Sequence, residues 1–432
     1  MVMSNSTANL SREQLGLIFI TSMGGFLELY DFIIYALMAP YIADQFFPGH
    51  DTYTSLLTTF ATFSIGYLVR PLGGVVFGHL GDRFGRKPVF VATVLVMALS
   101  TFLMGCLPTY SQIGIWAPLM LVFLRILQGF SIGGEIPGAM TYLSETVHQR
   151  RGLVVSLLFS ALTNGILFGS LVNAFMLWWL PENSMQEWGW RVPFWLGGTL
   201  GICSYIVRKH FQESGLFLQL AKHKTRSAVP LVQLLQQHRR KLLAGVLLAA
   251  PGASSITLLF LFTPGYLTKM LNYPGSDVAL AGGIGIFFTS LVTIVAGHLA
   301  DLLPVRRLLF AAYGFIVLFS VPVFYWYETG ADVYRVMLFS GLMVGSLTGG
   351  LLTLSILFPV IVRYSGIAFC YNAGYALFGG LTPVIAMALI GWSDNLQAPA
   401  WYLMTSGGLG LLAAWKLPAL HNTNSALSSS PK

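Results

Sequence analysis

Twelve apolar stretches, each long enough to cross a lipid bilayer, take up most of this chain. A helix needs about 20 apolar residues to span the hydrocarbon core of a membrane. The stretches lie at about 15–40, 53–79, 88–107, 115–143, 152–179, 190–209, 242–268, 277–300, 306–326, 332–360, 365–390 and 398–418. Only 9% of the residues are charged and 55% are hydrophobic, whereas about a quarter of a soluble domain is charged. We therefore expect an all-α membrane protein with twelve transmembrane helices.

A polar loop and its weaker copy divide the chain into two related halves. The loop Gly78-His79-Leu80-Gly81-Asp82-Arg83-Phe84-Gly85-Arg86-Lys87 follows the second apolar stretch, and Gly297-His298-Leu299-Ala300-Asp301 begins the copy, which ends at Arg306-Arg307. Such an echo predicts two pseudo-symmetric six-helix bundles. The expected units are an N-terminal segment 1–14, bundles 15–209 and 242–418, a linker 210–241 between them, and a tail 419–432.

The positions of Lys and Arg predict the orientation of these helices. With both termini in the cytoplasm, 19 of the 24 basic residues lie in cytoplasmic segments, as the positive-inside rule requires. The net charge of +8 is therefore explained by topology, and we expect no nucleic-acid partner. The basic linker 210–241 is expected to be partly helical on the inner surface, where it can bind anionic lipid headgroups.

The loop and several further motifs resemble those of the major facilitator superfamily. The first copy of the loop matches at Gly78, Leu80, Asp82, Arg83, Gly85, Arg86 and Lys87. Other motifs resemble the branch of bacterial metabolite:proton symporters for proline/betaine, citrate, 2-oxoglutarate and shikimate. They are Glu28-Leu29-Tyr30-Asp31-Phe32 with Tyr35, Arg70-Pro71-Leu72-Gly73-Gly74, Gln128 to Glu135, Trp188 to Phe194, and Arg363-Tyr364-Ser365-Gly366 with Tyr371-Asn372. One departure is Leu29-Tyr30, where the family has Trp.

Five charged residues fall at membrane depth, all of them in the first half: Glu28, Asp31, Arg70, Arg125 and Glu135. A charge there costs at least about 2.5–3.5 kcal/mol, so these residues need partners, water or a substrate, and fixed ion pairs are the alternative to a functional role. Glu28 and Asp31, three apart, are expected to share one helix face. Two neighbouring carboxylates resist double ionisation, so this pair, or Glu135 beside Gly133-Gly134, is the predicted proton site.

The candidate substrate ligands follow from the same charges and from the resemblance. A guanidinium suits planar carboxylates, which makes Arg125 a candidate, with Asp31 as its other possible partner; Arg70 can bind substrate or stabilise packing. The resemblance implies that the first, fourth, seventh and tenth spans line a central cavity. The remaining candidates are Tyr35, Ser254, Ser255, Tyr371 and Asn372.

The loop 78–87 is predicted to act as a gate. Gly78 and Gly81 permit close helix contact, and Asp82 can face a helix N-terminus of the other bundle, in the eleventh span, and pair with Arg86. The copy around Asp301 lacks the second glycine, so its lock is expected to be weaker. The alternative is that Arg83, Arg86 and Lys87 are topology signals only.

These observations predict a proton-coupled symporter that takes up a small carboxylate-bearing metabolite by alternating access. Three acids against two arginines also leave room for a cationic group on the substrate. The alternatives are a proton-driven exporter on the same fold or a non-transporting membrane sensor. We expect no enzyme activity, because the sequence shows no nucleophile–base pair, metal cluster or nucleotide loop. The expected partners are the metabolite, a proton and membrane lipid, with no cofactor or metal, in a monomer of the bacterial inner membrane.

Overall fold

The computed structural model describes residues 11–48, 52–84, 86–146, 150–209, 234 and 236–416. Throughout this part the chain is helical, and none of it forms a strand. The first half contains α1 Arg12–Leu37, α2 Ala39–Phe46, α3 Thr52–Leu68, α4 Arg70–Phe84, α5 Arg86–Cys106, α6 Tyr110–Ile113, α7 Trp116–Ile132, α8 Glu135–Thr146, α9 Arg151–Trp179, α10 Glu182–Glu187, η1 Gly189–Arg191 and α11 Val192–Lys209. The second contains α14 Arg239–Ile256, the π-helix η2 Thr257–Phe262, α15 Thr263–Met270, α16 Gly275–Leu302, α17 Val305–Glu328, α18 Val333–Gly345, α19 Thr348–Leu357, α20 Val360–Gly374, the π-helix η3 Tyr375–Gly380, α21 Thr382–Ser393 and α22 Pro399–Lys416.

Each of the twelve predicted spans coincides with a helix or with consecutive helices. Within the described ranges, nine helical stretches are long and apolar enough to cross a membrane by length and composition. The other three spans coincide with α5, α11 and α22. The linker and the tail lie almost wholly outside the described residues, so their expected conformations stay predictions.

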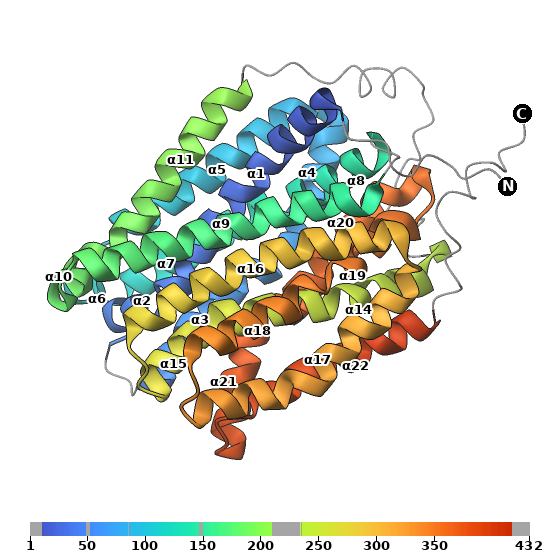
Figure 1. Cartoon of the computed structure of the whole chain (residues 1–432). Coiled ribbons are helices and arrows are strands. Elements are labelled where there is room, and N and C mark those ends of the chain that lie inside the picture. Colours follow the sequence, from blue (N-terminus) through green and yellow to red (C-terminus); the bar gives the residue numbers. More distant parts are fainter. Residues whose placement is uncertain are drawn as a thin grey trace, which may run out of the picture.

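The two halves lie beside each other and meet along α9 and α16 (Figure 1). We call the end of the molecule where α8 and α16 finish the inner end, and the end where α9 and α21 finish the outer end; the Lys and Arg distribution predicts that the inner end is cytoplasmic. Tryptophans gather at the outer end, and Trp178 and Trp392 are exposed there. Trp190 is buried instead, with its ring against Phe46.

Prolines explain why several spans are interrupted. A proline has no N–H to donate to the carbonyl four residues before it. Two prolines follow a break in a helix: Pro71 after Val69 and Pro137 after Gly133-Gly134. Two others follow a π-helix: Pro264 after η2 and Pro383 after η3. Lipid offers no replacement donors, so protein side chains must supply them. Side chains also bond to carbonyls within the two π-helical stretches: Thr263 donates to the Leu258 carbonyl over 2.7 Å, and Tyr402 donates to that of Phe378 over 3.0 Å.

Glycines allow α3 and α4 to lie directly on α7 in the first half. A Cβ placed on Gly129 would collide with the carbonyl of Gly66, and one placed on Gly73 with the carbonyl of Phe130. Gly133 makes a similar approach to the backbone of Arg70. The backbones therefore touch, which is how small residues hold helices together in lipid, where there is no hydrophobic drive between helices.

Substitution of Gly129 by alanine should destabilise the first half. The added methyl group overlaps a backbone carbonyl, and overpacking of this kind costs about 1–3 kcal/mol, so we expect a lower thermal unfolding midpoint for the purified protein in detergent. Gly408→Ala in α22 is the matched control, because nothing lies within 4 Å of its new methyl group; it should leave the midpoint unchanged or raise it. Equal midpoints for the two variants would contradict backbone contact between α3 and α7.

Candidate functional site

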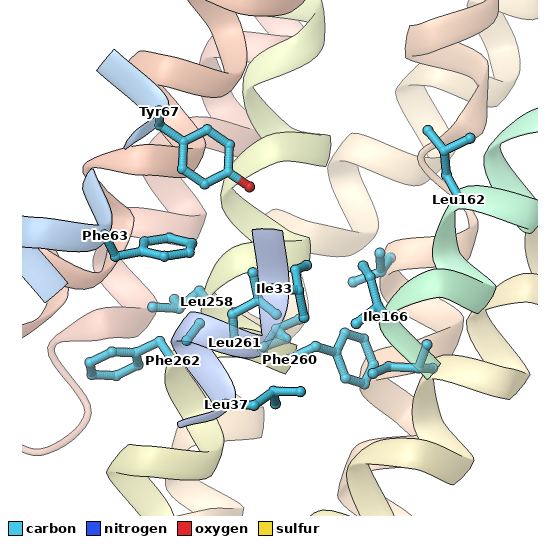
Figure 2. Packing of buried hydrophobic residues seen from close by; sticks show 14 of the residues in the cluster. Ile33, Leu37, Phe63, Tyr67, Leu162, Ile166, Leu258, Phe260, Leu261 and Phe262 are labelled. Atoms are coloured by element: carbon cyan, nitrogen blue, oxygen red, sulfur yellow. The ribbon is translucent and has the colours of Figure 1, made fainter. Parts of the chain in front are cut away.

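A cavity of about 70 Å³ lies between the two halves. Its walls come from α1, α3, α4 and α9 of the first half and from α14, η2, α16, α18, α19, α20 and η3 of the second. Figure 2 shows apolar side chains around this space, among them Ile33, Leu162, Ile166 and Leu261, with the hydroxyl of Tyr67 pointing into it. The expected lining by the first, seventh and tenth spans is present. Among the described lining residues the fourth span contributes none, and the second, fifth, eighth and eleventh spans contribute instead.

Arg70 and a group of aromatic rings form the polar side of this cavity. Arg70 is buried at the start of α4, and its guanidinium lies over the Tyr67 ring, 4.2 Å from the ring centroid. Tyr371 and Tyr375 stack with their centroids 4.3 Å apart, and Phe159 lies 6.3 Å from Tyr371. All five line the cavity. Arg70 and Tyr371 are thus the two predicted substrate ligands that the structure places at a common site.

Two of the three additional aromatic residues at the cavity lie one helical turn from a residue that the sequence predicted to bind substrate. Tyr67 precedes Arg70 by three positions, and Tyr375 follows Tyr371 by four, so each lies on the same helical face as a residue that was proposed. Phe159 in α9 had no such signal, because nothing in the sequence indicated that the fifth span borders the cavity.

Arg125 is held by protein groups outside this cavity lining. The guanidinium lies over the Tyr35 ring at 4.3 Å and donates to the Gln128 side chain and, over 3.4 Å, to the Phe63 carbonyl. Gln128 in turn donates to the Asp31 carbonyl and to the Thr101 hydroxyl. Arg125 therefore joins α7 to α1 and α3, and the expected pairing with a substrate carboxylate receives no support from its position. Tyr35, whose hydroxyl donates to the Thr59 carbonyl, belongs to the same packing.

Glu28 and Asp31 are both buried in α1. Glu28 directly precedes Leu29, which lines the cavity. Asp31 faces α11, where Gly197 and Gly201 leave space beside its carboxyl oxygens. Among the described residues those two oxygens have no hydrogen-bond partner. Asp31 therefore lies between α1 and α11, and the expected sharing of one helix face with Glu28 stays a prediction.

Glu135 and Asn372 meet the interruption of the fourth span. Glu135 begins α8 directly after Gly133-Gly134 and is partly exposed. Pro137 removes the N–H that would reach the Gly133 carbonyl, and the Asn372 side chain, from the other half, donates to that carbonyl over 2.6 Å. Asn372 thus connects the halves and does not line the cavity, although it was predicted to bind substrate.

Ser254 and Ser255 also lie away from the cavity. The Ser254 hydroxyl is 2.7 Å from that of Ser406 in α22 and also donates to the Ala250 carbonyl. Ser255 is fully buried beside it in α14. Besides the three tyrosines, the hydroxyl-bearing residues that line the cavity are Thr163, Thr289, Thr293 and Thr348. Cavity-facing threonines thus replace the two predicted serines.

At the inner end the second copy of the loop joins the two halves. Asp301, at the end of α16, accepts hydrogen bonds from the backbone N–H groups of Gly152 (2.7 Å) and Leu153 (2.9 Å) at the start of α9. A carboxylate suits a helix N-terminus, where unpaired N–H groups and the helix dipole favour negative charge. Gly297 also packs on Gly152 without room for a side chain. The second copy therefore forms a contact that joins the halves, and its strength relative to the first copy stays a prediction.

The first copy of the loop spans the end of α4 and the start of α5, with Gly85 outside the described residues. The structure does not describe the side chains of residues 78–91, which include Gly78, Gly81, Asp82, Arg83, Arg86 and Lys87. α4 does pack against α20, the inner part of the eleventh span. The predicted contact of Asp82 with that span stays a prediction.

The halves also touch at the outer end. Tyr53 of α3 donates to the Met387 carbonyl of α21 over 2.7 Å, and the rings of Phe60 and Phe262 lie 5.6 Å apart. Ser64 donates to the Gly380 carbonyl in η3. Contacts between the halves thus lie on both sides of the cavity, as in an occluded state. Within the described residues no group of three His, Cys, Asp or Glu side chains could hold a metal ion.

Two helical bundles that enclose a cavity, with separate contacts at either end, are the architecture of a secondary transporter that works by alternating access. The family described as "Sugar (and other) transporter" matches residues 17–234. The glycine betaine/proline/ectoine/pipecolic acid transporter OusA of Dickeya dadantii (strain 3937) is 33% identical over 410 residues, which cover 90% of this chain and 80% of that protein.

Further relatives and solved structures agree. The proline/betaine transporter of Escherichia coli (strain K12) is 32% identical over 409 residues, covering 90% of this chain and 81% of that protein. The proton:xylose symporter XylE, bound to 6-bromo-6-deoxy-D-glucose, has a TM-score of 0.73 at 17% identity, covering 96% and 98%. This chain belongs to the major facilitator superfamily, in the metabolite:proton symporter branch that contains the proline/betaine transporters. It is a multi-pass membrane transporter and not an enzyme.

Substitution of Asp301 by alanine should open the inner end. Two hydrogen bonds to a charged group are lost, each worth about 1.5–3 kcal/mol, so the equilibrium should move at least about tenfold toward inner-open states. Double electron–electron resonance between spin labels on the inner ends of α9 and α16 should show this opening as longer distances between the labels. Asp332→Ala is the control, because Asp332 caps its own helix α18; an unchanged distance distribution in Asp301→Ala would contradict the lock.

Asn372 and Pro137 should be energetically coupled. Asn372→Leu leaves the Gly133 carbonyl without its donor, which should cost about 1–3 kcal/mol of unfolding free energy. Pro137→Ala restores a backbone N–H for the same carbonyl, so in that background the cost of Asn372→Leu should fall by at least half. A double-mutant cycle of thermal stability measures the coupling, and additive effects of the two substitutions would contradict it.

Proposed function

We propose that this protein takes up a small zwitterion with a carboxylate group, such as glycine betaine or proline, together with a proton. The observation that carries the proposal is the placement of Arg70: a buried guanidinium in the wall of a central cavity. The names of the relatives, which are transporters of betaine, proline, ectoine and pipecolic acid, agree with this substrate class.

Arg70 is the proposed ligand of the substrate carboxylate. A guanidinium donates two parallel hydrogen bonds to a carboxylate, which fixes both the distance and the orientation of the bound molecule. The cavity threonines Thr289 and Thr348, from the second half, offer hydroxyl groups to the same solute. A substrate held between Arg70 and these threonines contacts both halves, so its binding favours the occluded arrangement.

The size of the cavity favours a small substrate. One water molecule needs about 10–15 Å³ of such space, so about 70 Å³ holds roughly five to seven. Betaine, with eight heavy atoms, is slightly larger than this and would require a small expansion of the cavity. Tricarboxylates and sugars would require the cavity to widen.

Glu28 is the proposed proton carrier nearest to the site, with Asp31 and Glu135 as the other candidates. Glu28 is buried and directly precedes Leu29, which lines the cavity together with Arg70. Protonation of Glu28 and binding of a carboxylate at Arg70 would together neutralise both charges in this region. The proton and the zwitterion together add one positive charge to this region, so the carboxylate–guanidinium pair and the aromatic rings must stabilise the loaded site in the apolar barrier between the two open states.

The transport cycle follows from the contacts at the two ends. Opening of the outer end requires loss of the Tyr53–Met387 hydrogen bond, and opening of the inner end requires loss of the Asp301 contacts with α9. The two sets lie on opposite sides of the cavity, so the halves can rock about the substrate. We place the protein in the bacterial inner membrane with both termini in the cytoplasm, on the distribution of Lys and Arg.

Uptake by purified protein in liposomes tests the substrate class. Labelled glycine betaine and proline should accumulate when the lumen is alkaline, and Arg70→Lys should raise the KM about 10- to 100-fold, because the loss of a charged bidentate contact costs about 1.5–3 kcal/mol. Asp332→Asn, an exposed aspartate, is the control for a change of a charged group. Failure of either compound to accumulate, or an unchanged KM in Arg70→Lys, would contradict the proposal.

Carboxyl-to-amide substitutions test the proton site. Glu28→Gln should abolish accumulation driven by the pH gradient but retain exchange of labelled for unlabelled substrate, because exchange needs no net proton movement. Asp31→Asn and Glu135→Gln are measured in the same way. If all three variants still accumulate substrate under a pH gradient, the assignment of the proton to these carboxylates is wrong. If a sodium gradient alone drives accumulation, sodium and not the proton is the coupling ion.

A further inference from the structure

We propose that the aromatic cluster Tyr67, Phe159, Tyr371 and Tyr375 binds the cationic end of the substrate and selects for N-methylated ammonium groups. This rests on the proposed function and deepens it, because it names which zwitterions the cavity prefers. The cluster combines residues from α3, α9, α20 and η3, and thus from both halves of the protein.

The geometry of the cluster shows that its rings can face a cation. Arg70 already lies 4.2 Å above the Tyr67 ring centroid, within the distance of about 6 Å at which a ring quadrupole attracts a positive charge. The stacked pair Tyr371 and Tyr375, with Phe159 beside Tyr371, lines the same polar side of the cavity, where η3 packs on α3 and α20 packs on α4. A zwitterion with its carboxylate on Arg70 would therefore place its ammonium group, two bonds away, among these rings.

The rest of the lining decides which ammonium group is favoured. Among the described residues that line the cavity, Arg70 is the one charged side chain, and the lining contains no Asp or Glu. A primary ammonium carries three N–H donors that lose water on entry, and the side-chain acceptors it meets in the described lining are neutral Thr and Tyr hydroxyls and no carboxylate. A quaternary ammonium has no donors to satisfy, and its methyl groups pack on apolar and aromatic walls while the charge acts on the ring faces.

The inference predicts a ranking of related compounds. Binding should strengthen with each methyl group along the series glycine, sarcosine, dimethylglycine and glycine betaine. The carbon isostere of betaine, 3,3-dimethylbutyrate, has the same shape and carboxylate but no positive charge. It should bind about thirtyfold more weakly than betaine, the size of one desolvated cation–π contact.

The experiment is competition of these five compounds against labelled glycine betaine in liposomes containing the full chain. Each variant is judged by the ratio of its affinity for betaine to that for glycine, because a ratio does not depend on how much protein is folded. Tyr371→Leu and Tyr375→Leu should lower this ratio at least tenfold. Tyr371→Phe keeps the ring and should keep the ranking. Phe319→Leu removes a ring from a cluster elsewhere in the second half and should keep it as well.

The outcomes separate this inference from the proposed function. If all the zwitterions compete equally, or if 3,3-dimethylbutyrate competes as well as betaine, the aromatic cluster does not select the cation, although transport of zwitterions by this protein stands. If Tyr371→Leu and Tyr375→Leu leave the ratio unchanged, the selection lies elsewhere and the inference is overturned. If neither betaine nor proline is bound or transported, both the inference and the proposed function are overturned.

Discussion

The structure depends on one constraint: inside a membrane, every backbone carbonyl that loses its helical partner must find another donor in the protein. Prolines create such carbonyls in the broken spans of this chain. The Asn372 side chain donates to the free carbonyl of Gly133, and this hydrogen bond joins the two halves. The same proline interruptions place Arg70 and Tyr375 beside the cavity. Interrupted helices therefore serve both the substrate site and the contact between the halves.

The buried charges of the first half divide according to what surrounds them. Arg125 is held by Gln128, by the Phe63 carbonyl and by aromatic rings, and stabilises the packing of α7. Arg70 lies in the cavity wall. Asp31 lies against Gly197 and Gly201 of α11, whereas Glu28 lies next to Leu29 of the cavity lining. Residues with the same chemistry thus have different roles, because the direction in which each helix face points decides whether a side chain meets protein or cavity.

The second copy of the repeated loop contributes a contact between the two halves. The copy at Asp301, which departs further from the family pattern, makes two backbone hydrogen bonds across the interface, because the end of α16 meets the N-terminus of α9. That contact needs one carboxylate and two closely packed glycines, Gly152 and Gly297. The second copy of the loop therefore marks one contact between the halves at the inner end.

The sequence by itself determined the twelve helices, their division into two bundles and the family, because apolar length and motif spacing are local properties. It also identified Arg70 and Tyr371 at the cavity. Only the tertiary structure decided that Arg125, Tyr35, Ser254, Ser255 and Asn372 turn to other helices, and that Tyr67, Phe159 and Tyr375 join the site. The physical reason is that a transmembrane helix buries polar groups on several faces. The position of the neighbouring helices decides which face borders the cavity, and that position depends on contacts between residues far apart in the chain.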